Sequence, residues 1–265
     1  LLKVCCKSRG TVMNKNTLKK NRNRIIAAVI WVIVWQAASV LTGLELVLAS
    51  PVSVLCELFK MLTKPDTYRI IAVSMSGIIS GYLAAFVMGC ISGYLADRYQ
   101  MAKIFLEPPV ALMKSLPMAS FIILLIIWFG SGKVAVLTSF IVAFPMIYKG
   151  VANGFSMRDS NLLEMAEVFQ VSLPKRIFWI DIPRIIEVAG TDFKMAVSYG
   201  WKAGVSAEVI GLARMSIGEQ MYYSKLYIDT ASLFAWSIMV VVLSFVWEKL
   251  WTAVLYYVKK RLERI

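Results

Sequence analysis

The stretch at residues 70–96, IIAVSMSGIISGYLAAFVMGCISGYLA, decides the fold class of this chain. It contains no Asp, Glu, Lys or Arg. A helix needs about 20 predominantly apolar residues to cross the hydrocarbon core of a bilayer. We therefore predict that this stretch forms a transmembrane helix.

Similar apolar stretches lie on both sides of it. Four are free of charged residues: 25–44, 115–132, 134–148 and 230–247. A sixth candidate, residues 185–212, carries charges that include Asp192, Lys194, Lys202 and Glu208. Exposing each such charge to lipid would cost about 2.5–3.5 kcal/mol, so we expect this helix to pack inside the protein or beside a water-filled path. The sequence predicts an all-α membrane protein with about six transmembrane helices.

Composition supports this class and argues against nucleic-acid binding. The chain has 265 residues, of which 59% are hydrophobic and 17% are charged, whereas soluble domains have roughly 45–50% and 25%. The formal net charge is +13, but the basic residues are scattered between apolar segments and form no single stripe. In a membrane protein, such an excess is typical of cytoplasmic loops and contacts with lipid headgroups.

Enzymatic chemistry finds little support in the sequence. There is no His, and the four Cys residues form no C-x-x-C pair, so we predict neither a metal site nor a disulfide framework. The run from Gly130 to Lys133 superficially matches a P-loop. The Walker pattern requires Gly and Ser or Thr where this chain has Ile127 and Val134. We expect no ATP hydrolysis and no bound cofactor in this chain.

The distribution of Lys and Arg predicts that both termini are cytoplasmic, because these residues concentrate in loops that this orientation places inside. We divide the chain into a basic N-terminal segment (1–24), a transmembrane domain (25–257) and a basic cytoplasmic tail (258–265). Residues 1–12 precede Met13, which is typical of a natural start, and they are left out of the fold reasoning.

The loop at residues 153–183 is too polar to span the membrane, yet it is patterned. Apolar residues recur there with the spacing of one helix face, at Leu162, Met165, Ala166 and Phe169. Possible N-caps are Asp159, Ser160 and Asn161, and Asn161-x-x-Glu164 matches a capping box. A second short helix is predicted to begin near Pro174 and to end at Pro183. The pattern predicts two short helices at the cytoplasmic surface.

This loop resembles the EAA loop of binding-protein-dependent ABC importer permeases, whose pattern is E-A-A, three residues, G, nine residues, I-x-L-P. The chain has Glu164-Met165-Ala166, Gln170 and Ile180-Asp181-Ile182-Pro183 at these positions. The spacing is kept, while Met165 and Gln170 depart from the pattern. Lys114-Ser115-Leu116-Pro117, Ile127-Trp128-Phe129-Gly130 and the stretch from Trp201 through Ala207-Glu208-Val209-Ile210-Gly211 are similar to spans of the nitrate/sulfonate/taurine branch.

The resemblance implies a type I ABC importer permease in a bacterial plasma (inner) membrane. It implies coupling helices that seat in a groove of a separate ATPase, with contacts from Glu164, Met165, Ala166, Glu167, Phe169, Gln170, Ile180 and Pro183. It also implies several partners: two ATPase subunits that hold ATP and Mg, a second permease copy or a paralogue, and an extracytoplasmic solute-binding protein. An amphipathic segment resting on the bilayer is the alternative for this loop.

Gln170 raises a question about the end of the first coupling helix. The Gly of the pattern permits a positive φ, which would cost Gln roughly 1 kcal/mol or more. Either the turn is built differently or the helix continues through Gln170.

Polar residues of the segment 185–212 are candidates for the translocation path. Lys194, Ser198 and Lys202 recur every fourth residue and share one helix face, while Glu208 need not pair with them. Such a basic face could attract an anion; interhelical ion pairing or snorkelling is the alternative. Sulfonates, taurine, nitrate and thiamine-precursor pyrimidines are all compatible cargoes. A secondary transporter or channel without an ATPase is the alternative function, but we see none of the repeats that favour it.

Overall fold

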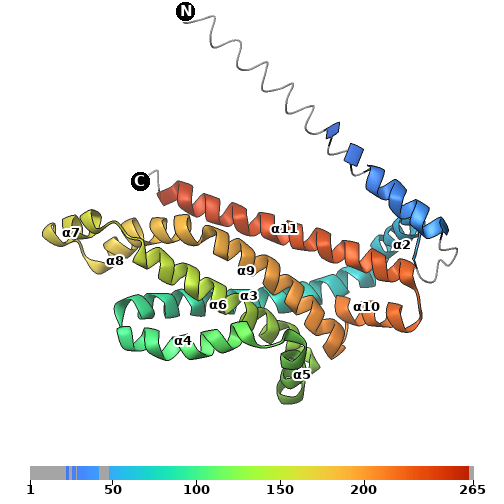
Figure 1. Ribbon diagram of the computed structural model, residues 1–265, viewed down its shortest axis with the longest axis horizontal. Coiled ribbons are helices and arrows are strands. Elements are labelled where there is room, and N and C mark those ends of the chain that lie inside the picture. The colour runs from blue at the N-terminus through green and yellow to red at the C-terminus, as the bar shows by residue number, and fades with distance from the viewer. Residues whose placement is uncertain (1–21, 24–25, 28, 42–47, 263–265) are drawn as a thin grey trace, which may run out of the picture. The chain divides into compact units, whose positions relative to one another are not determined.

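The computed structural model describes residues 22–23, 26–27, 29–41 and 48–262, which form helices joined by short turns and contain no strand. Figure 1 shows the helices in chain order. Their bounds are α2 Pro51–Thr63, α3 Pro65–Arg98, α4 Gln100–Ser115, α5 Met118–Phe129, the 3₁₀ turn η1 Ser131–Lys133, α6 Val134–Ser156, α7 Ser160–Val168, α8 Leu173–Arg176, the π-helical turn η2 Ile177–Asp181, α9 Ile182–Gly211, α10 Ile217–Leu226 and α11 Thr230–Leu262.

The described residues form two compact units. The smaller unit combines the chain up to Met61 with Ser224–Ala235, and the larger combines Leu62–Tyr223 with the chain from Trp236 onward. In the smaller unit, the ring centroids of Trp35 and Phe234 lie 5.6 Å apart. The larger unit contains α3 to α9 and most of α11, and it holds all the candidate functional residues discussed below.

Small residues bring α3 and α6 close together in the larger unit. A Cβ atom on Gly89 would lie 2.7 Å from Ile147 Cγ2, and one on Gly93 would lie 2.6 Å from Val151 Cγ1. Neither position of α3 can therefore carry a larger side chain without a shift of α6. Such close approach replaces the hydrophobic effect as the main driving force between helices in lipid.

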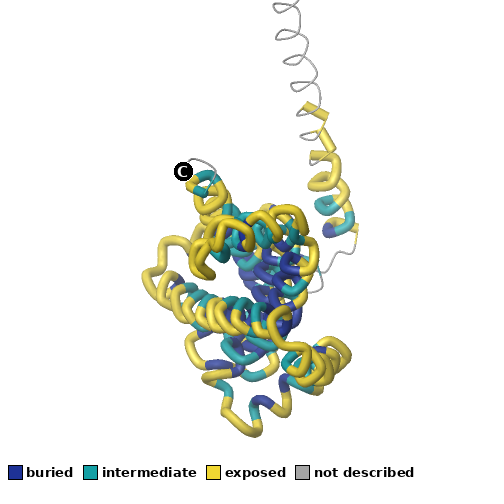
Figure 2. The backbone as a smooth tube through the Cα atoms, turned by 90° about the vertical axis from the view of Figure 1, so that its left-hand side faces the viewer, coloured by how far each residue is buried: buried dark blue, intermediate teal, exposed yellow. Residues whose placement is uncertain are grey.

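Aromatic side chains complete the core between α3, α9 and α11. The ring of Tyr82 meets that of Trp251 edge-on at 5.0 Å between centroids, and Phe86 meets Phe193 at 5.3 Å. The indole Nε1 of Trp201 donates a hydrogen bond of 3.1 Å to the carbonyl oxygen of Val240. Figure 2 shows the buried residues gathered inside the larger unit, with exposed residues around it.

Among the residues that the structure describes, three helices are long and apolar enough to cross a membrane: Pro65–Arg98, Thr230–Leu262 and the continuous segment Ser131–Ser156. They confirm the spans predicted at residues 70–96, 134–148 and 230–247. The pair α4 and α5 passes the same test as a bent span, with 108° between its halves. α9 has 30 residues but does not pass, because of its polar residues. The first predicted span lies partly outside the described residues, which include a shorter apolar helix at Val29–Leu41.

The structure corrects the bounds of the span predicted at residues 115–132, because its helix α5 is one half of the bent pair with α4. α5 has only 12 residues, about 18 Å of helix, and the preceding charged segment is not a loop but helix α4. Pro117 explains the break, because it disfavours the helical conformation at the residue before it. Leu116 accordingly takes extended angles, φ −67° and ψ 132°.

The prediction that a short helix ends at Pro183 was wrong. α8, η2 and α9 follow one another without a break, and Pro183 lies in the first turn of α9. Proline has no N–H to donate, and the regular α-helical bonding pattern is already interrupted by the π-helical turn η2 directly before it. The second half of the segment at residues 153–183 therefore continues directly into α9.

Candidate functional site

The short helix α7 begins at a side-chain cap. Asp159 is its N-cap residue, and its Oδ1 atom accepts a hydrogen bond of 2.9 Å from the backbone N–H of Asn161. Asn161 lies inside the helix, so the predicted capping box with Asn161 as the cap was wrong. An acidic cap also complements the positive end of the helix dipole.

The other end of α7 answers the question raised by Gln170. Gln170 has φ 51°, in the left-handed region. The N–H of Val171 donates to the carbonyl of Ala166 at 2.9 Å, and the N–H of Gln170 donates to that of Glu167 at 3.0 Å. This pair of bonds is a Schellman motif, which usually has Gly at this position. The helix ends at Val168, and Gln170 adopts the left-handed turn that Gly would favour. Both predicted alternatives, a differently built turn and a helix that continues through Gln170, were therefore wrong.

α7 presents a bare apolar edge to its surroundings. The exposed fractions of Val168 and Phe169 are 78% and 74%, and Leu162 and Met165 are also exposed. Of the predicted apolar stripe, Ala166 alone is buried. Glu164, Glu167 and Gln170 are exposed as well. Large exposed apolar patches with a polar rim are typical of interaction sites.

A groove of about 690 Å³ lies beside α7 and brings together residues from four elements. Met165 of α7 lines it with Ile180 of η2, Pro183 of α9 and Leu262 of α11. The two ends of the predicted coupling segment therefore meet in space. Glu164, Glu167, Phe169 and Gln170 do not line this groove.

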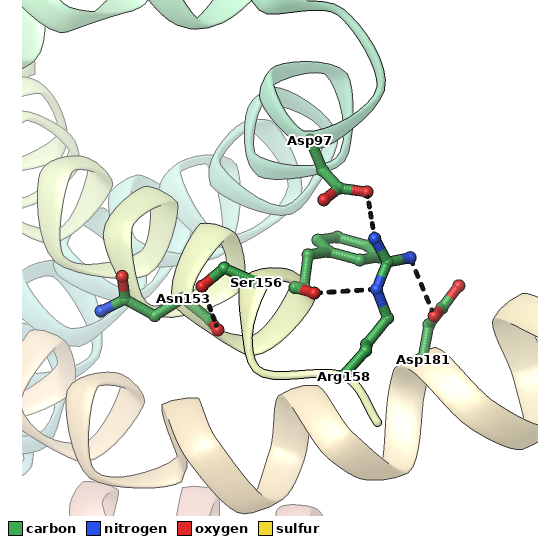
Figure 3. A network of polar contacts seen from close by, with 6 residues as sticks. Asp97, Asn153, Ser156, Arg158 and Asp181 are labelled. Atoms are coloured by element: carbon green, nitrogen blue, oxygen red, sulfur yellow. Dashed lines mark hydrogen bonds and ion pairs between the residues drawn. The ribbon is translucent and has the colours of Figure 1, made fainter. Parts of the chain in front are cut away.

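Arg158 anchors the base of α7, and the sequence reasoning missed this role. Its Nη2 atom lies 2.7 Å from Asp97 Oδ2 at the end of α3, and its Nη1 atom lies 3.2 Å from Asp181 Oδ1 in η2 (Figure 3). Its Nε donates to the carbonyl of Phe155 at 2.8 Å, and its guanidinium lies 5.0 Å from the centre of the Phe155 ring. One side chain thus joins α3, the α6–α7 turn and η2.

A sequence signal for this anchor existed but was weak. Asp181 stands between Ile180 and Ile182, and it is 2% exposed in the structure. A buried carboxylate requires a partner, and Arg158 immediately precedes the cap of α7. Asp97, Arg158 and Asp181 lie far apart in the sequence, so the sequence alone does not show that they are close in space.

The candidate path residues of α9 lie on two different faces. Lys194 and Lys202 are exposed and Ser198 is half-buried, whereas Glu208 is buried. The Lys202 Nζ atom lies 5.8 Å from the centre of the Tyr199 ring. Within the described part of the chain, neither lysine forms an ion pair. Their stripe is therefore a polar surface on a helix that packs elsewhere against α6.

Glu208 instead joins α9 to α3 and to the start of α10. Its Oε2 atom accepts hydrogen bonds from Ser74 Oγ at 2.8 Å and from the N–H of Gly218 at 3.3 Å. The N–H of Ile217 donates to Ser74 Oγ at 2.8 Å. Glu208 thus holds a turn in place, and it does not extend the stripe of Lys194, Ser198 and Lys202.

Apolar helices of membrane length and a polar stripe on the long helix α9 are typical of a multi-pass membrane protein, and the exposed apolar edge of α7 is typical of an interaction site. Residues 85–254 match the family described as the binding-protein-dependent transport system inner membrane component, and the chain belongs to this family. It is an ABC importer permease of the nitrate/sulfonate/taurine branch, as the resemblance predicted.

Three relatives illustrate the similarity. A Bacillus subtilis protein named as an aliphatic sulfonates transport permease is 23% identical over 80% of this chain and 76% of its own length. A Brucella melitensis ABC transporter permease protein is 25% identical over 71% and 76%. The taurine transport system permease protein of Escherichia coli is 20% identical over 67% and 65%.

Proposed function

We propose that this chain forms the translocation path of an ATP-driven importer for sulfonate- or taurine-type solutes in a bacterial inner membrane. Two copies of the chain, or one copy and a paralogue, enclose the path. Two separate ATPase subunits hold ATP and Mg, and an extracytoplasmic binding protein delivers the solute. The path alternates between outward and inward access, and both termini of the chain are cytoplasmic.

The exposed apolar edge of α7 carries the ATPase part of this proposal. Burying a side chain such as Phe169 or Val168 in a partner groove stabilises a complex by about 1.5–3 kcal/mol each. An amphipathic helix in a groove is a common recognition mode. Arg158 ties the base of α7 to α3 and η2, so a displacement of α7 would be transmitted to helices of the membrane domain.

The solute class is supported by two observations. Relatives are named for aliphatic sulfonates and for taurine, which share a sulfonate group. The exposed stripe on α9 includes two lysines without a carboxylate within ion-pair distance among the described residues. Such a stripe is costly against lipid and is suited to a path taken by anions.

Co-purification with a candidate ATP-binding-cassette ATPase tests the proposal. Glu164→Lys reverses a charge on exposed α7, and we expect it to weaken ATPase association and abolish uptake while membrane insertion is retained. Asp66→Lys is the matched control, because it makes the same reversal in the first turn of α3 and should leave association intact. Unchanged association and uptake with Glu164→Lys would reject the docking of α7 on an ATPase.

A further inference from the structure

A second polar cavity lies where α4 breaks into α5. It has a volume of about 350 Å³ and is walled by α4, α5, α6 and α9. Lys114 enters it from the last turn of α4, Lys149 from α6 and Asp192 from α9. None of these three residues was among the path residues predicted from the sequence.

The cavity has an excess of positive charge. Lys114 is within electrostatic reach of both Lys149 and Asp192, but among the described residues none of the three forms an ion pair within 4.0 Å. Lys114 and Lys149 are exposed and Asp192 is half-buried, so solvent partly screens the repulsion between the two ammonium groups, but the single carboxylate neutralises only one of them. A bound anion would relieve that repulsion.

The backbone around the cavity also leaves space for its charged groups. A Cβ atom on Gly150 would lie 3.0 Å from Asp192 Oδ2, so Gly150 gives room to this carboxylate. Leu116 and Met118, on the two sides of the break, line the cavity. The first N–H groups of α5 lack intrahelical acceptors, and half-helix N-termini in transporters point toward anionic groups of substrates.

The remaining wall is apolar and adaptable. Methionine side chains reach the cavity from all four helices: Met113, Met118, Met146 and Met195. Methionine is unbranched and polarisable, so it accommodates apolar groups of varying shape. The cavity therefore combines a cationic part, which suits an anionic head, with a soft apolar part, which suits a hydrocarbon body.

We propose that this cavity is a cargo subsite for an amphiphilic organic anion of the alkylsulfonate class. The sulfonate lies between Lys114 and Lys149, and the alkyl body lies against the methionines. This inference rests on the proposed function, because cargo must reach the cavity. An inorganic oxyanion such as nitrate would leave the methionine wall without a contact, so it binds more weakly at this subsite.

Charge-selective thiol modification of the full-length chain in lipid nanodiscs tests the subsite. The four native cysteines are replaced by serine, and Met195→Cys places a single thiol in the cavity wall. Rates of an anionic sulfonatoethyl methanethiosulfonate and its cationic trimethylammonioethyl analogue are compared with their rates on free cysteine. We expect a preference of about tenfold for the anionic reagent, as charged clefts concentrate counter-ions by this order.

Charge variants sharpen the result. Lys114→Gln with Lys149→Gln should abolish the preference, and Asp192→Asn should increase it. Lys103→Gln is the matched control, because Lys103 lies on the same helix but outside the cavity, and it should leave the preference unchanged. A preference that is absent from the parent, or that survives loss of both cavity lysines, would overturn the subsite.

Protection of the thiol from modification distinguishes a site for organic anions from a site that binds any anion. Butanesulfonate should slow modification of Met195→Cys in a concentration-dependent way, while nitrate at the same ionic strength should not. Equal protection by the two salts would reject the alkylsulfonate assignment. The labelling assay contains no ATPase, so a negative result in it would reject the subsite without bearing on ATPase association. If the proposed function is wrong, the chain would instead fail to associate with the ATPase while the labelling pattern stays unchanged.

Discussion

The two ends of helix α7, its base at Arg158 and its tip at Val168 and Phe169, differ in how they are built. At the base, Arg158 meets Asp97 and Asp181 in a largely buried network. At the tip, the side chains of Val168 and Phe169 are mostly exposed. Burying the charged groups of the base has a desolvation cost, and their ion pairs hold the base rigidly. The tip instead leaves apolar side chains exposed. The difference suggests that a force applied by a partner at the exposed tip is passed through the rigid base to α3 and η2.

Removing the central cation of the base should have the largest effect. Arg158→Met leaves Asp181, whose side chain is 3% exposed, as a buried carboxylate without a cation. Breaking such a pair from one side typically costs 3–5 kcal/mol. We expect a large fall in the Tm of the detergent-solubilised chain, together with loss of uptake.

Arg158→Lys provides the control for this prediction. It keeps one charge but cannot bond to both carboxylates with the planar fork of a guanidinium. Its Tm should lie between those of the parent and Arg158→Met. If Arg158→Met melts at the same temperature as the parent, the network has no anchoring role.

Shortening the tip should weaken association without changing the fold. Phe169→Ser removes an exposed ring, so the Tm should not change, but the lost burial of about 1.5–3 kcal/mol corresponds to a roughly 10- to 100-fold rise in the Kd for the ATPase. Phe105→Ser on α4, whose side chain is 79% exposed, is the matched control and should leave the Kd unchanged. Equal effects of the two variants would contradict a specific role of the α7 tip.

The features that were predicted correctly from the sequence are those determined by local residue patterns. Residues 70–96 reveal α3 because an uncharged run of that length has few stable states outside lipid. The apolar spacing predicted α7, and Asp159 was among the three predicted caps, but the left-handed turn at Gln170 was not predicted. The predicted features depend on neighbours within a few residues, which a sequence displays directly.

What the sequence could not predict depends on contacts between distant segments. Arg158 bonds to residues 61 and 23 positions away, and no local pattern reports such partners. The helix α4 was hidden by Lys103, Lys114 and two internal prolines, Pro108 and Pro109. Its existence depends on packing against α3 and α6, which overrides the low helix propensity of proline.

The two carboxylates of the base should differ in their importance. Asp97 is more exposed than Asp181, with side-chain exposures of 24% and 3%. Partly exposed ion pairs contribute about 0–1 kcal/mol, so Asp97→Asn should lower the Tm only slightly. Asp181→Asn should lower it more, because it removes the buried partner of Arg158. A larger loss from Asp97→Asn would mean that the end of α3, and not η2, is the main attachment of α7.

The smallest expected effect is a stabilisation at the turn between base and tip. Gln170 has φ 51°, a conformation that costs a residue with a Cβ about 1 kcal/mol more than Gly. Gln170→Gly should therefore raise the Tm slightly, because the Schellman bonds remain while the strain is removed. Gln170→Ala is the control: it removes the same side-chain amide, keeps the Cβ and should not stabilise. If both variants raise the Tm equally, the gain comes from losing the amide and the left-handed turn is not strained. If only Gly stabilises but uptake falls, the stiffer Gln turn itself contributes to transmission from the tip to the base.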